Sequence, residues 1–193
     1  MPKSDRWITQ KAELGMITPF VPELVRRESD RAVISYGLSS YGYDLRLSPD
    51  DFRIFRHIPG TVVDPKRFSP ENLEPAKLHS DDSGKYFILP GHTYGLGVAL
   101  ERIEIPGNVT VICIGKSTYA RTGLIANMTP GEAGWRGHLT LEFSNSSNAD
   151  CRIYANEGIV QLLFFEGDPC AVNYETRNGK YQDQTKEVTL ARV

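Results

Sequence analysis

Glu142 is the first candidate for chemistry, because it lies in segment 138–144, where apolar and polar residues alternate. In a strand this alternation sends Leu139, Leu141 and Phe143 to one face and Glu142 to the other. A carboxylate in such a place can accept and return protons as a general base and acid. A solvated surface glutamate has the same pattern, so the segment by itself leaves both interpretations open.

A second candidate is the basic segment 115–123, which follows the apolar run 109–114. A glycine at a strand end, followed by a short helical turn, exposes backbone N–H groups that suit phosphate oxygens. Lys116 adds charge there, and Ser117 and Arg121, four residues apart, would share one face of such a turn. The G-x-x-x-x-G-K-[ST] order of a P-loop is absent, so a solvent-facing basic turn is an equal alternative.

The elements that must position these residues are mainly short strands. After Pro19, runs of Val, Ile, Leu, Tyr and Phe alternate with clusters of Gly, Pro, Asn and Asp, which is typical of a β-barrel or jelly-roll-like sandwich. The strand candidates are 43–47, 86–89, 95–100, 109–114 and 138–144. Ser4 or Asp5 is expected to cap one short helix that ends at Gly15. The polar stretch 62–83 predicts a long surface loop.

Composition excludes several classes of protein. The 193 residues are 40% hydrophobic and 24% charged, which fits a folded domain with a core. The formal net charge of −2 gives no overall positive field, so neither nucleic acid nor a membrane is expected as a partner. No signal peptide or membrane span is expected either. Cys113, Cys151 and Cys170 lack the spacing of a zinc or redox motif, which predicts reduced thiols in a cytoplasmic protein.

Five motifs follow one another along the chain: SYGLSSYGYD (35–44), GKSTYAR (115–121), TLEFSN (140–145), IYANEG (153–158) and GKYQ (179–182). Together they resemble the deoxycytidine triphosphate (dCTP) deaminase family of the dUTPase-related superfamily, from about Trp7 to Val193. The resemblance implies a mainly β, distorted β-barrel or jelly-roll-like fold with a short N-terminal helix. It implies one domain over residues 1–193, with a helix and lead-in over 1–20 and a nucleotide-closing segment over 174–193. A homotrimer with nucleotide sites between subunits is implied as well.

The same resemblance implies an activity: hydrolytic removal of the 4-amino group of dCTP, giving ammonia and the dUTP used for dUMP and dTTP synthesis. Glu142 would activate the water, Ser117 would hold this water or the C4 region, and Arg121 would fix the carboxylate and a phosphate or base group. The residues implied to bind substrate are Lys116, Ser117, Thr118, Tyr119, Ala120, Arg121, Thr140, Leu141, Glu142, Gln161, Tyr174, Lys180 and Gln184. Mg²⁺ would be bound through the triphosphate, with no metal ligand from protein side chains.

Zinc is not expected in this reaction. Zinc deaminases carry H-x-E and P-C-x-x-C motifs, and the sequence contains neither. Its four histidines are scattered at His57, His79, His92 and His138. His138 is expected to be a surface or interface residue, and Trp135 a packing anchor.

Segment 129–137 departs from the family pattern. It reads TPGEAGWRG, whereas close relatives usually have a bulkier residue after Thr-Pro and a proline after the glutamate. We therefore assign no sugar contact to Asn127, Gly131 or Glu132. A bifunctional enzyme that also forms dUMP, or a plain dUTPase, would need a second carboxylate such as Glu132. A non-catalytic nucleotide-binding module would need no proton shuttle and is the alternative from another class.

Overall fold

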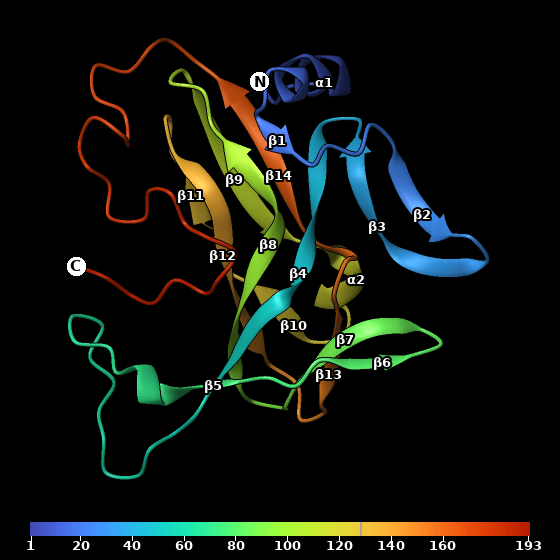
Figure 1. Ribbon diagram of the computed structural model, residues 1–193, viewed down its shortest axis with the longest axis vertical. Helices are drawn as coiled ribbons and strands as arrows, with labels where there is room; N and C mark the ends of the chain where they lie inside the picture. The colour runs from blue at the N-terminus through green and yellow to red at the C-terminus, as the bar shows by residue number, and fades with distance from the viewer. Residues whose placement is uncertain (128) are drawn as a thin grey trace.

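A curled β-sheet forms the body of the protein in a computed structural model, which describes residues 1–127 and 129–193 (Figure 1). The strands are β1 (Ile17–Thr18), β2 (Leu24–Glu28), β3 (Arg31–Ser39), β4 (Gly42–Phe55), β5 (Leu73–Pro75), β6 (His79–Asp81), β7 (Gly84–Leu89), β8 (Tyr94–Glu104), β9 (Val109–Gly115), β10 (Leu124–Ala126), β11 (Thr129–Gly131), β12 (Arg136–Asn145), β13 (Cys151–Tyr154) and β14 (Gly158–Glu166). The helices are α1 (Asp5–Glu13), the 3-10 turn η1 (Pro70–Asn72) and α2 (Ser117–Ala120).

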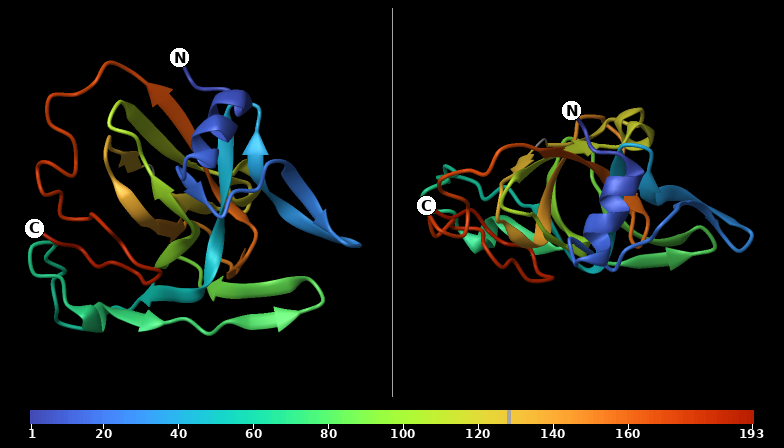
Figure 2. Two further views of the ribbon diagram at one scale, coloured as in Figure 1. Left: turned by 45° about the horizontal axis from the view of Figure 1, so that its top comes forward. Right: turned by 90° about the horizontal axis from the view of Figure 1, so that it is seen from above.

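The main sheet follows the order β10-β12-β8-β4-β14-β9-β11. Strands β1, β2, β3 and β5 pair beside this path, and β13, β7 and β6 form a separate three-stranded sheet. From above, the strands curve around the core as a half-barrel (Figure 2). The predicted fold class, mainly β with a barrel-like sheet and a short N-terminal helix, is confirmed. No helix in the described part of the chain is long and apolar enough to cross a membrane.

Phe52 of β4 lies at the centre of the core. The centroid of its ring is 5.0 Å from that of Phe87 and 6.1 Å from that of Phe143. On β8, a Cβ added at Gly95 or Gly97 would come within 2.9–3.0 Å of the Phe52 ring. These glycines give the ring room, so that β8 and β12 pack tightly around it. Core packing therefore fixes β12, the strand that carries Glu142.

The predicted strands are all present, but the expected loop over 62–83 is partly wrong. This stretch contains the 3-10 turn η1 and two strands: β5 pairs with β4, and β6 pairs with β7. Strands of three residues are too short to show an alternating apolar pattern in the sequence. Their formation depends on the neighbouring strands with which they pair. Helix α1 begins after Ser4, and Gly15 follows it with a positive φ of 95°, as the sequence predicts. Ser4 occupies the N-cap position, but its side chain does not form the expected cap hydrogen bond.

Strand β12 departs from strict alternation. Its register with β8 shifts between His138 and Thr140, which marks a β-bulge or irregularity. Leu139 consequently is only partly buried: it packs against the edge of the core and also lines a pocket, whereas Leu141 is buried in the core. His138 was expected at a surface or interface, but it is only 9% exposed, with Nδ1 3.2 Å from the Ala99 carbonyl oxygen. Sequence alternation cannot place these two side chains, since a bulge inverts the facing of the residues before it.

Candidate active site

A cavity of about 380 Å³ lies against β12 and contains the carboxylate of Glu142. Its walls come from β8, β11, β12, the 56–69 loop and the C-terminal segment. The lining residues are Phe68, Tyr94, Leu96, Thr129, Pro130, Gly131, Glu132, Trp135, Leu139, Thr140, Glu142, Tyr174, Tyr181, Gln184, Thr189 and Ala191. We call this cavity the Glu142 pocket. Its aromatic walls and few polar groups suit a flat heterocyclic base.

Glu142 is half-buried in this pocket, and burial raises the pKa of its carboxyl group above the ordinary value of 4.5. Within the described chain, only its own backbone N–H stabilises the charged form by a hydrogen bond. Its position also affects nearby groups: burial, then the charge of Glu142, raises the pKa of both Tyr94 and Cys113 to about 12. A carboxyl group with a raised pKa and no bound partner side chain suits proton transfer.

The C-terminal segment closes one side of the pocket. The backbone N–H of Thr140 donates to Gln184 Oε1 at 3.0 Å, and that of His138 donates to the Gln184 carbonyl at 2.9 Å. Thr140 Oγ1 in turn accepts from the backbone N–H of Thr189 at 3.0 Å. Tyr174 is buried, and its hydroxyl accepts from the backbone N–H of Tyr181 at 2.9 Å. Thr140, Tyr174 and Gln184 thus line the same pocket as Glu142.

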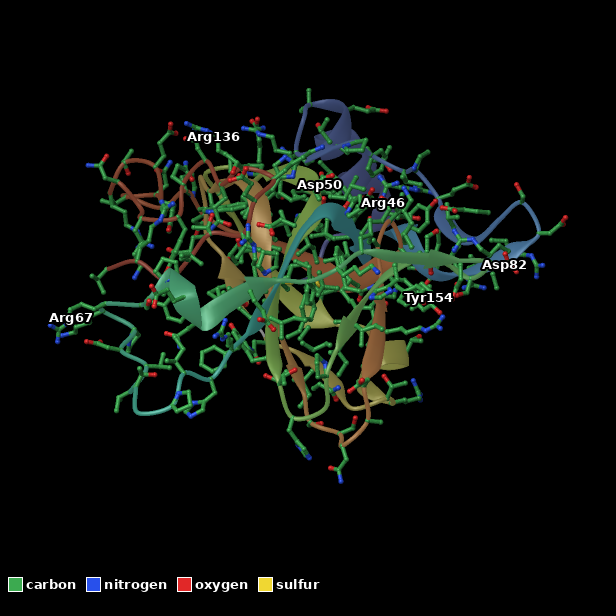
Figure 3. All side chains as sticks on the ribbon, turned by 60° about the horizontal axis from the view of Figure 1, so that its bottom comes forward. Arg46, Asp50, Arg67, Asp82, Arg136 and Tyr154 are labelled. Carbon is green, nitrogen blue, oxygen red and sulfur yellow. The ribbon has the colours of Figure 1, made fainter. Side chains whose placement is uncertain are left out.

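Ion pairs tie the same segment to the start of β12. Arg136 contacts Glu175 and Asp183, each at 2.7 Å, and Figure 3 shows Arg136 on the side where the C-terminal segment lies. Trp135 Nε1 donates to the Tyr181 carbonyl at 2.7 Å. These contacts hold the segment over the pocket while its outer surface stays exposed.

Predicted segment 115–123 forms a strand end followed by the short helix α2. The backbone N–H of Arg121 donates to the Ser117 carbonyl at 3.2 Å, which confirms the helical turn. Ser117, Thr118 and Arg121 are exposed. The Tyr119 side chain is buried, and its hydroxyl accepts from the backbone N–H of Tyr154 at 2.9 Å. Only the backbone of Tyr119 is therefore available to a ligand on this surface.

Lys116 connects the turn to the body of the sheet. Its ammonium forms an ion pair with Asp44 and donates to Ser35 Oγ at 3.2 Å. Gln161 Nε2 donates to the same Asp44 at 3.0 Å and lies 3.3 Å from Ser39 Oγ. We call these five residues the Lys116 network. The network positions the loop before α2. It also engages the side chains of Lys116 and Gln161, which the family resemblance assigns to substrate binding.

The predicted site residues therefore fall into two groups. Thr140, Glu142, Tyr174 and Gln184 surround the Glu142 pocket, whereas no residue of 116–121 is among its described lining. In Figure 1, α2 and the C-terminal segment lie on opposite sides of the molecule. Leu141 is buried in the core, and Lys180 points outward, its ammonium donating to the Arg192 carbonyl at 2.6 Å.

The sequence pattern does not identify several residues of the pocket lining. Trp135 is a packing anchor in the core, as the sequence predicts, and it also lines the pocket. Phe68 is half-buried in the pocket wall, although it belongs to a polar loop whose Val62 is 92% exposed. A single aromatic residue in a polar loop was the available signal for Phe68. Nothing in the local pattern of Tyr94 distinguishes it from other strand tyrosines.

Within residues 1–127 and 129–193, no group of three or more His, Cys, Asp or Glu side chains is arranged to hold a metal ion. Cys113, Cys151 and Cys170 are all free thiols. Hydroxyl and basic side chains at 116–121 are chemically suited to a phosphate group that brings its own cation.

The chain is similar to known proteins in both sequence and fold. A family model described as dCTP deaminase-like matches residues 3–167. The dCTP deaminase of Aromatoleum aromaticum is 49% identical, and that of Azotobacter vinelandii 50%, over 99% of this chain and 98% of each relative. The solved 2'-deoxycytidine 5'-triphosphate deaminase of Agrobacterium tumefaciens matches the fold with a TM-score of 0.56 at 13% identity. That match covers 86% of this chain and 48% of the solved one, so this chain spans about half its length.

Proposed function

Because the chain belongs to the dCTP deaminase-like family, we propose that it converts dCTP and water to dUTP and ammonia. Relatives of the same length that are named dCTP deaminase support a deaminase function. The structural observation that carries the proposal is the carboxylate of Glu142, which lines an aromatic pocket of suitable size and has no partner side chain in the described part of the protein.

Glu142 would act as the proton shuttle. Water adds to C4 of cytosine while the carboxylate takes one water proton and delivers it to N3. The same carboxylate then moves the remaining hydroxyl proton to the exocyclic amine. The C4–N4 bond breaks, C4 becomes a carbonyl, and ammonia and dUTP leave. Burial of Glu142 favours this exchange, since its raised pKa brings the acid and base forms closer in free energy near neutral pH.

Ser117 and Arg121 would complete the catalytic group. We infer that the Ser117 hydroxyl holds the attacking water or the C4 region, and that Arg121 fixes the Glu142 carboxylate and a phosphate or base group. Ser117, the first residue of α2, and Arg121, which directly follows the helix, are both exposed and available to a ligand. The remaining residues of 116–121 would hold the triphosphate, and Thr140 would line the base site together with Tyr174 and Gln184.

A homotrimer with sites between subunits would bring the two groups together. The loop 116–121 and the Glu142 pocket are separate within one chain, as a site shared by neighbouring subunits requires. Ile112 on β9 and Ile125 on β10, next to α2, are 40% and 49% exposed, which suits burial against a neighbour. Gln161 and Lys180 would then approach the nucleotide from the assembled site.

Mg²⁺ would accompany the triphosphate, whose charge it neutralises, with its coordination supplied by phosphate oxygens. The deamination step would not use zinc, because the sequence lacks the H-x-E and P-C-x-x-C motifs. A cytoplasmic enzyme fits the three free thiols.

The alternative to a deaminase that releases dUTP is a bifunctional enzyme that also cleaves the triphosphate. Glu132 also lines the pocket and could activate water at the α-phosphate, which would yield dUMP and pyrophosphate. Its carboxylate is paired with Arg177, which opposes that role. A non-catalytic nucleotide-binding module would have no use for the uncommitted Glu142.

The decisive experiment incubates the purified protein with dCTP and Mg²⁺, with and without a zinc-selective chelator. Nucleotides are separated by chromatography and ammonia is assayed. We expect equimolar dUTP and ammonia in both samples. Formation of dUMP from dCTP would favour the bifunctional enzyme. If dCTP stays intact, a second sample with dUTP follows: its cleavage would favour a dUTPase. Bound but unchanged dCTP would favour the binding module. Loss of activity with the chelator would contradict zinc independence.

A further inference from the structure

Tyr94 shares the pocket face with Glu142. In the ladder between β8 and β12, Tyr94 is paired with Ser144, and Leu96 with Glu142. Residues two apart on a strand point to the same face, so Tyr94 and Glu142 are diagonal neighbours. Diagonal neighbours have Cα atoms about 7–8 Å apart, a span that long side chains can cover. Both side chains line the same cavity.

The Tyr94 hydroxyl is uncommitted, unlike other polar aromatic groups of the wall. Trp135 Nε1 donates to the Tyr181 carbonyl, the Tyr174 hydroxyl accepts from the Tyr181 N–H, and the Tyr181 hydroxyl accepts from the Arg192 N–H at 3.1 Å. Tyr94 has no hydrogen-bond partner in the described part of the chain. Burial keeps the phenol protonated well above neutral pH, so it is available as a donor.

We propose that Tyr94 is a further substrate-binding residue, whose hydroxyl donates a hydrogen bond to O2 of the pyrimidine while Glu142 works at N3 and C4. This inference rests on the proposed function and extends it to recognition of the base. N3 and the exocyclic amine both change protonation during deamination, whereas O2 remains a carbonyl acceptor in dCTP and dUTP. A fixed phenol donor therefore suits O2. N3 lies between O2 and C4 on the edge of the ring, so two side chains that are neighbours on one face of the sheet, Tyr94 on β8 and Glu142 on β12, can reach O2 and the N3–C4 region together.

The test is Tyr94→Phe, which keeps the ring and removes only the hydroxyl. The kcat/KM for dCTP should fall about tenfold, the loss expected for one hydrogen bond in a desolvated site. The matched control is Tyr86→Phe on β7. Tyr86 is also buried, and it does not belong to the described pocket lining. We expect the control to keep wild-type kcat/KM, and both variants to keep the wild-type Tm within about 2 °C, since neither removes core volume.

A substrate change tells O2 contact from a purely structural role. In 2-thio-dCTP, sulfur replaces O2 and accepts hydrogen bonds weakly. The wild-type enzyme should lose about tenfold in kcat/KM on this analogue, and Tyr94→Phe should lose nothing further, because the hydroxyl it lacks is the group concerned. Equal losses for both enzymes would overturn the O2 assignment. A wild-type rate for Tyr94→Phe on dCTP would also overturn it, whereas wild-type protein inert toward dCTP would refute the proposed function itself.

Discussion

The ammonium of Lys116 is paired with the carboxylate of Asp44, 72 residues earlier in the chain, and both side chains are almost removed from water. The pair joins the loop before α2 to β4, and Gln161 adds a hydrogen bond from β14. A charge left alone at such a depth is costly, because neither water nor a counter-ion solvates it.

Asp44→Asn should therefore destabilise the protein by about 3 kcal/mol, the usual loss when one member of a buried pair is removed. It should also raise KM for dCTP, because the loop that we assign to the triphosphate loses its attachment. Urea unfolding and steady-state kinetics measure the two effects. Asp82→Asn is the control, since Asp82 is exposed and lies in the turn between β6 and β7, outside the Lys116 network.

Adding Lys116→Met to Asp44→Asn should restore part of the lost stability, because no unpaired charge then remains buried. Strictly additive losses in the double variant would argue against the ion pair.

Gly137→Ala should weaken the closure of the pocket. Gly137 has a φ of 139°, and a Cβ there would come 2.6 Å from the backbone nitrogen of Gln184. Strain of this kind costs about 1–3 kcal/mol. Displacing the C-terminal segment should consequently raise KM for dCTP by roughly 5- to 150-fold and make the segment more susceptible to limited proteolysis.

Gly60→Ala is the matched control for that change. Gly60 also has a positive φ, of 80°, but a Cβ there would meet nothing within 4 Å. If both variants raise KM equally, backbone strain in general, and not contact with Gln184, is responsible.

Glu142→Gln should make the protein more stable at neutral and alkaline pH. The pKa of Glu142 is raised on folding, so wild-type stability is full below the ordinary value of 4.5 and falls as pH rises through the folded pKa. Glutamine has no such loss. The difference in Tm should therefore be absent near pH 4, grow with pH, and then level off. Tyr94 on β8 and Cys113 on β9 are the titratable neighbours, and both stay neutral over this range. A difference in Tm that does not depend on pH would contradict this assignment.

Mixing two inactive variants tests whether the site is shared between subunits. Arg121→Ala and Glu142→Gln should each be inactive alone. In randomly mixed trimers, about one quarter of sites would pair an intact Glu142 with an intact Arg121 of the neighbour. Recovery of about that share of wild-type activity after co-refolding is expected. No recovery would mean that each chain supplies both residues to its own site.

The strands at 43–47 and 109–114 could be predicted from sequence because apolar residues form an alternation or a run of strand length there. The burial of Asp44 could not be predicted from that pattern, since it depends on pairing with Lys116. The short helical turn expected after Gly115 is present at 117–120. His138 and Leu139 could not be placed, because the irregularity in β12 depends on its register with β8. Strands β5 and β6 are likewise determined by their pairing partners.

The candidate site likewise contains residues that could be predicted from sequence and contacts that could not. Motifs identified Glu142, Thr140, Tyr174 and Gln184, which the fold brings to one pocket. They could not reveal that Lys116 and Gln161 bind Asp44, since these contacts join β4, β14 and the residue that follows β9, which are far apart in the sequence. Phe68 enters the pocket from a loop, and its contribution arises only when the chain has folded.

The most direct measurement of the central claim compares wild-type protein with Glu142→Gln in a single-turnover reaction with dCTP and Mg²⁺, following ammonia and dUTP. Calorimetric titration with dCTP provides the affinity of each protein. We predict that the variant binds dCTP within a few-fold of wild type but forms ammonia at least about 100-fold more slowly, the contribution expected of a general acid–base group. Turnover by Glu142→Gln at close to the wild-type rate would contradict the account and remove this carboxylate from the reaction.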